Sequence, residues 1–164
     1  MALLTAGVAC VTDLQRRRIP NVLTFGSAAM ALVFHAASGG VADLGAAASG
    51  CLIAGGIFFL PFALGGMGAG DVKLLAALGA WFGPADAVSL VVATAIAGAV
   101  LAFAVAYLYG YLWQALVNLR LMLSHWWVVG LRPVDGLTLA GSSGPRLAYA
   151  VPIFLGTVVT VWLH

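Results

Sequence analysis

The chain has 164 residues, of which 63% are hydrophobic and only 7% are charged. Soluble domains carry about 25% charged residues, so this chain has too few to cover a surface that faces water. The composition therefore excludes an ordinary soluble protein and predicts an integral membrane protein with a single domain, residues 1–164. The 21 glycines favour close approach of helices in a bilayer. The expected fold class is all-α, a polytopic bundle of membrane helices.

Apolar segments recur along the chain at lengths typical of membrane helices, which need about 20 residues. About six spans are predicted. The first is short, so either its helix continues past Asp13 towards the arginines or the recorded start is a few residues late. The fourth is also short, which would place Asp71 within the membrane interface. The predicted spans are residues 1–12, 22–37, 44–64, 72–82, 87 to about 113, and 147–163.

The segment from about residue 113 to 131 is apolar but carries Gln114, Asn118 and His125 on one helical face. This polar stripe predicts a helix that lies in the membrane interface rather than a seventh span. The tryptophans near its two ends suit the depth of the lipid headgroups. Residues 136–145, which contain several Gly, Ser and Pro, are predicted to form a flexible cytoplasmic loop.

The basic residues are distributed unevenly between the two sides of the predicted bundle. With six spans, all seven Lys and Arg residues fall on one side, whereas the other side holds Asp43 and Asp86. By the positive-inside rule, the basic side is cytoplasmic and both termini lie outside the cytoplasm. Asp13 and Asp71 are then predicted at the cytoplasmic face. The basic residues are Arg16, Arg17, Arg18, Lys73, Arg120, Arg132 and Arg146.

A carboxylate lies at the end of a glycine-rich stretch, Gly-Ala-Gly-Asp-Val-Lys at 68–73. A carboxylate near hydrocarbon is costly, so Asp71 is a functional candidate by default. Gly68 and Gly70 leave the backbone flexible, with space beside the carboxylate where a peptide could lie. The competing interpretation is that Asp71 merely caps the following helix, since aspartate is a good N-cap. Capping does not explain a second aspartate on the same face.

That second aspartate, Asp13, ends the first apolar segment. Three arginines follow it, and then Ile-Pro-Asn at 19–21. Pro20 and Asn21 are good start signals for the next helix. The alternative interpretation of Asp13 is an acidic residue paired with the arginines in a cytoplasmic turn.

Together, an aspartate, basic residues, Ile-Pro-Asn and a later Gly-x-Gly-Asp-Val-Lys resemble the type IV prepilin peptidases, the membrane-embedded G-x-G-D aspartyl proteases. The resemblance implies that Asp13 and Asp71 are the catalytic pair. The stretch 147–157 looks like the family's final helix, although Ala148 replaces the proline usual there. The other motif residues implied to support the pair are Gly68, Gly70, Lys73, Pro20 and Asn21.

The resemblance also implies an activity and a location. It implies an endopeptidase of the bacterial inner membrane that removes the short leader from prepilins, after a glycine, on the cytoplasmic side. The chain lacks the paired C-x-x-C segment of longer bifunctional members, and so looks like the short form found with tight-adherence (Flp) pilus systems, without N-methyltransferase activity. The expected partners are a prepilin and the lipid bilayer, with no nucleic acid.

The expected chemistry follows from two carboxylates that lie close together. They cannot both ionise cheaply, so they share a proton. The ionised carboxylate takes a proton from water, the water attacks the scissile carbonyl, and the protonated carboxylate donates to the carbonyl oxygen. We expect no cofactor and no metal in this reaction.

Other reactive groups have weaker sequence support. Cys10 and Cys51 form no C-x-x-C motif, and none of the three histidines has an H-E-x-x-H context. Gly-Ser-Ser-Gly at 141–144 superficially resembles the G-x-S-G of rhomboid serine proteases. The only later histidine, His164, would lie about 31 Å along the same predicted helix. The segment is therefore predicted to be a loop, and the remaining histidines are His35 and His125.

Two functions of other classes remain open. A proton-coupled transporter of small solutes could use the same two aspartates as proton carriers. Against it, transport sites usually lie near the membrane midplane between repeated halves, whereas these aspartates lie at helix ends in a chain without a repeat. An assembly factor without catalysis would need neither carboxylate.

Overall fold

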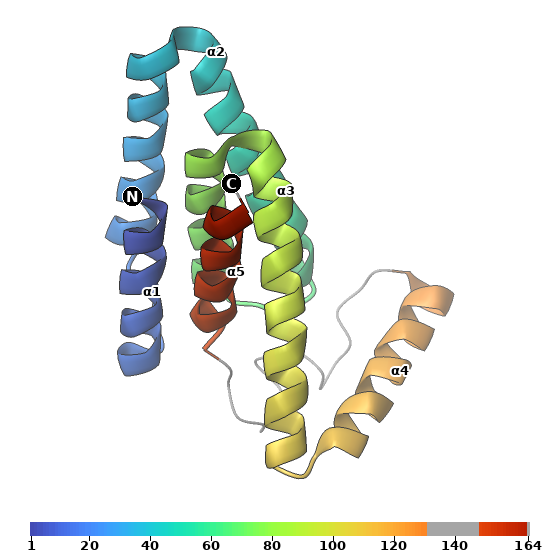
Figure 1. The fold of residues 1–164 in the computed structure, drawn as a ribbon. Helices are drawn as coiled ribbons and strands as arrows, with labels where there is room; N and C mark the ends of the chain where they lie inside the picture. The colour runs from blue at the N-terminus through green and yellow to red at the C-terminus, as the bar shows by residue number, and fades with distance from the viewer. Residues whose placement is uncertain (131–147, 164) are drawn as a thin grey trace.

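The computed structural model describes residues 1–130 and 148–163, and every regular element in these ranges is a helix (Figure 1). The all-α prediction is therefore confirmed for the described part of the chain. The predicted loop at 136–145 and the Gly-Ser-Ser-Gly segment at 141–144 lie outside the described residues. The helices are α1 (Ala2–Arg16), α2 (Asn21–Ala63), α3 (Ala69–Leu108), α4 (Leu112–Val129) and α5 (Ala150–Leu163).

The long helices α2 and α3 each consist of two limbs joined at a glycine. Gly40 has φ 69° and ψ −147°, and Gly83 has φ 75° and ψ −177°. Residues with a Cβ rarely adopt such a backbone, so glycine is needed at both points. Figure 1 shows that each helix reverses direction there. The limbs correspond to the predicted segments 22–37, 44–64, 72–82 and 87–113.

Two helix ends near the aspartates differ from the prediction. α1 does not end at residue 12 but continues through Asp13 to Arg16. This agrees with the first explanation given for the short apolar segment, a helix that continues past Asp13 towards the arginines. α3 begins at Ala69 rather than at Val72. In both places the apolar run is shorter than the helix, because polar and glycine residues at its end also take helical backbone angles.

At its C-terminal end, α3 is shorter than predicted. The helix ends at Leu108 instead of residue 113, and Gly110, with φ 73°, forms the turn before α4. α4 coincides closely with the predicted interfacial helix, and Gln114 Nε2 donates a hydrogen bond to Asn118 Oδ1 at 3.3 Å on its polar stripe. Its position in the membrane interface stays a prediction.

α2 and α3 approach each other closely because small residues lie where they meet. A Cβ built on Gly79 would overlap the carbonyl oxygen of Gly50 and lie 2.8 Å from the Cβ of Ala54. A Cβ on Gly55 would lie 2.9 Å from the Cβ of Ala76. This backbone-to-backbone packing is typical of helices that associate within a bilayer.

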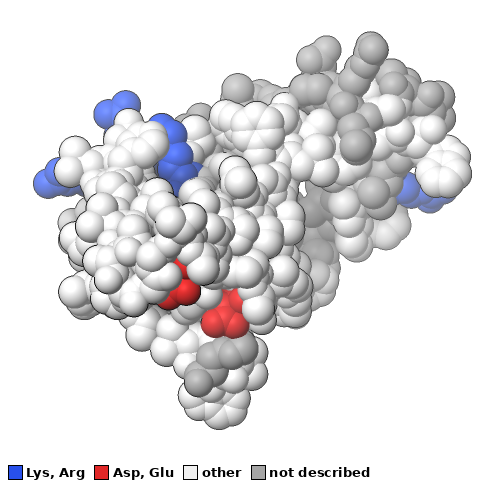
Figure 2. All heavy atoms as spheres, turned by 90° about the horizontal axis from the view of Figure 1, so that it is seen from above, with Lys and Arg blue, Asp and Glu red and all other residues white. Residues whose placement is uncertain are grey.

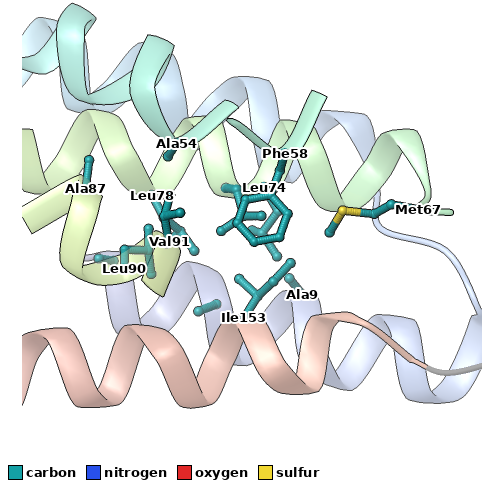
Figure 3. Close-up of a cluster of buried hydrophobic side chains, with 13 residues drawn as sticks. Ala9, Ala54, Phe58, Met67, Leu74, Leu78, Ala87, Leu90, Val91 and Ile153 are labelled. Atoms are coloured by element: carbon teal, nitrogen blue, oxygen red, sulfur yellow. The ribbon is translucent and has the colours of Figure 1, made fainter. Parts of the chain in front are cut away.

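A cluster of buried apolar side chains joins four of the helices. Figure 3 shows Phe58 of α2, Leu74 and Leu78 of α3, and Ile153 of α5 pointing toward one another, with Ala9 of α1 beside them. Leu74, Leu78 and Ile153 are fully buried. This cluster fixes α1 and α5 against α3, and so fixes the helix ends that carry the candidate site.

The outer surface is largely apolar. α2 and α3 are long and apolar enough to cross a membrane, and α5 is a shorter apolar helix. Large apolar side chains such as Val22 and Leu52 are 86% and 74% exposed. Seen from the end where α2 and α3 reverse, the surface is mostly uncharged, with acidic groups near the middle and Lys and Arg toward the margin (Figure 2). Such a surface suits lipid rather than water.

Candidate active site

Asp13 lies in the last turns of α1 with its side chain buried, at 9% exposure. The helix ends at Arg17, which takes a left-handed conformation with φ 53° and donates its N–H to the Asp13 carbonyl at 2.8 Å. The carboxylate Oδ2 accepts a hydrogen bond from the backbone N–H of Ala150 at 3.4 Å. Asp13 is therefore held both by its own helix end and by α5.

Asp71 lies in the first turn of α3 and is partly buried. The N-cap residue of this helix is Gly68 and not Asp71. The Asp71 carboxylate nevertheless accepts a hydrogen bond from the Gly68 backbone, so it contributes to capping from within the first turn. The carboxylate lies close to Gly68: a Cβ built on this glycine would be only 2.9 Å from Asp71 Oδ2. Glycine at position 68 thus leaves the space that the carboxylate occupies.

The two aspartates line one cleft of about 710 Å³ and interact electrostatically. The cleft lies where the end of α1, the start of α2 and the start of α3 meet. It brings together all seven residues that the sequence singled out, although they come from two segments far apart in the chain. These residues are Asp13, Pro20, Asn21, Gly68, Gly70, Asp71 and Lys73.

Short contacts hold the α1–α2 connection against α3. A Cβ on Gly70 would lie 3.3 Å from the Cβ of Ile19, so glycine allows this close approach. Pro20 is the N-cap of α2, which begins at Asn21, in agreement with the two start signals and one residue before the predicted span 22–37. Lys73 donates from Nζ to Asn21 Oδ1 at 3.0 Å. These contacts give the Ile-Pro-Asn and Gly-x-Gly-Asp-Val-Lys motifs a physical connection.

Lys73 and the arginines give the cleft a mixed electrostatic character. The Lys73 Nζ also lies 5.1 Å from the centre of the Phe25 ring, a cation–π distance. Arg16, Arg17 and Arg18 line the same cleft as the aspartates. Cations near a pair of carboxylates reduce the cost of holding negative charge there.

The start of α5 is a part of the site that the sequence interpretation did not assign. Ala150, its first residue, bonds to Asp13, and Tyr149 interacts electrostatically with Asp71. The only sequence signal was the position of this stretch in the family's final helix, with no role attached to either residue. A backbone donor has no signature in the sequence, because every residue except proline carries one.

The described histidines and cysteines do not line this cleft. His35 Nε2 is 3.4 Å from the carbonyl oxygen of Trp81, and Cys10 and Cys51 are free thiols. Among the described residues, no three His, Cys, Asp or Glu side chains are grouped so that they could hold a metal ion. The chemistry available in the cleft is that of two neighbouring carboxylates, which can exchange protons with water and a bound amide.

Comparison with known proteins identifies the family of the chain. The type IV leader peptidase family matches the chain over residues 1–103, a range that includes both aspartates and the residues that join the two motifs. No curated protein and no solved structure matches the chain. Because the family match covers more than half of the sequence, the chain belongs to the type IV leader peptidase family and is a peptidase.

Proposed function

We propose that the chain is an aspartic endopeptidase in which Asp13 and Asp71 are the catalytic pair. The observation that carries the proposal is that both carboxylates line one cleft and interact electrostatically, although they lie on different helices. The family of the chain indicates the reaction, which is cleavage of a leader peptide. The single domain of residues 1–164 would hold this site at one end of the bundle.

The mechanism uses one shared proton. One carboxylate removes a proton from a water molecule, which attacks the scissile carbonyl, while the protonated carboxylate donates to the carbonyl oxygen. The pair titrates as a unit, so the acid and base roles belong to Asp13 and Asp71 jointly. The spaces at Gly68 and Gly70 are taken by the Asp71 carboxylate and by Ile19. We therefore propose that the peptide lies in the open cleft that these residues line, and not in the space beside the glycines.

The substrate we propose is a prepilin of the Flp type, cut at the cytoplasmic face of the bacterial inner membrane. Its short leader would lie in the cleft while its apolar helix stays in the bilayer. The cytoplasmic side is supported by Arg16, Arg17, Arg18 and Lys73, which line the cleft. Six crossings would consist of α1, the two limbs each of α2 and α3, and α5. N-methylation is not expected, because Cys10 and Cys51 form no paired C-x-x-C motif.

Co-expression with a prepilin tests the proposal in cells. Asp13→Asn and Asp71→Asn keep the shape of each side chain but remove its proton chemistry, so leader removal should stop in both variants. Asp43→Asn is the matched control, since Asp43 is exposed and outside the cleft. Normal leader removal by either cleft variant would refute the assignment.

Labelling from each side of the membrane separates the peptidase from a transporter. Cysteines placed at positions 13 and 71, in a chain whose Cys10 and Cys51 are replaced by Ala, should react with an impermeant thiol reagent from the cytoplasm alone. Reaction from both sides in alternation would favour transport.

A further inference from the structure

The start of α5 reaches both members of the proposed catalytic pair. Ala150 is fully buried, and its N–H donates to Asp13 Oδ2 at 3.4 Å. Tyr149, the residue before it, interacts electrostatically with Asp71. The first N–H groups of a helix have no partner within the helix and carry partial positive charge, so they suit a carboxylate. The Ala150 N–H therefore contacts Asp13, and the phenol of the preceding residue is close enough to Asp71 for electrostatic interaction.

The ring of Tyr149 packs against the second limb of α3, at Gly98. A Cβ built on Gly98 would lie 2.5 Å from the Tyr149 Oη and 3.0 Å from its Cζ. Only a residue without a Cβ leaves this space, so the phenol rests directly against the backbone at Gly98. Tyr149 itself is partly buried, as expected for a ring packed between two helices.

A second close contact fixes the position of α5 along α3. A Cβ built on Gly156 would lie 2.8 Å from the backbone nitrogen of Thr94. Together with the buried side chain of Ile153, this contact sets how far α5 extends toward the cleft. The Tyr149–Gly98 contact involves the residue that directly precedes Ala150 in the chain, whose N–H bonds to Asp13.

We propose that Tyr149 is a positioning residue: by resting against Gly98 it fixes the start of α5, so that the Ala150 N–H holds the Asp13 carboxylate opposite Asp71. The inference depends on the proposed function, because it concerns the geometry of the same pair. Its physical basis is that reacting groups must be held closely, since an error of about 1 Å can reduce a rate about 100-fold.

Two substitutions test the contact from opposite sides. Gly98→Ala adds a methyl group where the Tyr149 hydroxyl lies, and should lower kcat for leader cleavage roughly ten- to 100-fold. Tyr149→Phe removes only the hydroxyl, and should lower kcat roughly two- to tenfold. KM for the prepilin should stay within about twofold in both, since the pair rather than the substrate is displaced.

The double variant distinguishes positioning from general packing. Tyr149→Phe removes the nearest of the atoms that the new methyl group would meet, so it should restore part of the kcat lost in Gly98→Ala. The controls are Gly56→Ala, which has no other atoms within 4 Å of the added Cβ, and Tyr107→Phe, which is exposed on the same limb of α3. Rates are divided by the amount of folded protein, which is measured by size-exclusion chromatography in detergent.

Several outcomes would overturn the inference. These are an unchanged kcat in both single variants, a raised KM with unchanged kcat, or a double variant no faster than Gly98→Ala. Asp13→Asn measured in the same preparations separates this failure from failure of the proposed function. If Asp13→Asn is inactive while Gly98→Ala and Tyr149→Phe are normal, the positioning role alone is wrong. If Asp13→Asn is active, the proposed catalytic pair is wrong.

Discussion

Lys73 donates a hydrogen bond from Nζ to Asn21 Oδ1 at 3.0 Å, and this bond joins the first turn of α3 to the first residue of α2. Both ends of the bond line the cleft that holds the two aspartates. The two side chains are therefore bonded in the fold although the residues lie far apart in the sequence.

Replacing Lys73 with Met should lower kcat/KM for leader cleavage roughly two- to tenfold, because one hydrogen bond that holds the cleft is lost. Asn21→Ala should have a similar effect. Since both variants break the same bond, the double variant should be little worse than either single one. Fully multiplicative effects of the two substitutions would contradict a shared role.

The rate of cleavage should depend on pH with a maximum, falling on both the acidic and the alkaline side. In the proposed mechanism, the pair of Asp13 and Asp71 is active only with one proton between them, so losing or gaining a proton stops the reaction. The measurement is kcat/KM from about pH 4 to about pH 9, with folding checked by circular dichroism at each pH. A rate that rises steadily to the alkaline limit would contradict a shared proton.

Gly79→Ala should destabilise the bundle by about 1–3 kcal/mol, because the added methyl group meets the backbone of Gly50 across the α2–α3 contact. Gly56→Ala is the matched control, since a Cβ there meets nothing within 4 Å. Unfolding in detergent, titrated with dodecyl sulfate, measures both. Equal stability of the two variants would show that the close approach of α2 and α3 contributes little.

A polar network inside the bundle gives a further prediction. Ser27 Oγ lies 3.0 Å from Thr5 Oγ1 and accepts a hydrogen bond from Trp81 Nε1 at 3.0 Å, and so connects α1, α2 and α3. Ser27→Ala should cost about 1–2 kcal/mol of stability, because it leaves two polar groups without this partner. Ser38→Ala is the control, since Ser38 bonds only to its own helix in an exposed position. The same titration compares the two.

The sequence was sufficient for the helical segments but not for all their ends. Hydropathy located both limbs of α2 and of α3, since each limb is an apolar run bounded by glycine or polar residues. It gave the helical turn at Asp13–Arg16 only as one of two explanations, and it missed the early start of α3 at Ala69, because those residues are polar or small. Where a helix ends depends on its caps and contacts, here Arg17 and Gly68, rather than on hydropathy.

The candidate site was predicted in its residues but not in its geometry. The resemblance supplied Asp13 and Asp71, and the structure brings both to one cleft. The contacts of Ile19 with Gly70 and of Ala150 with Asp13 could not be predicted, because they join segments through the tertiary fold. Backbone donors and the spaces left by glycine have no distinctive residue type to reveal them.

The most direct test of the account is the single-turnover rate of leader removal by the purified protein in lipid nanodiscs. Asp13→Asn and Asp71→Asn should each lower this rate at least about 1000-fold, as expected when a member of a catalytic pair is removed. Asp43→Asn should cleave like the unchanged protein. Cleavage at the normal rate by either Asp13→Asn or Asp71→Asn would contradict the account.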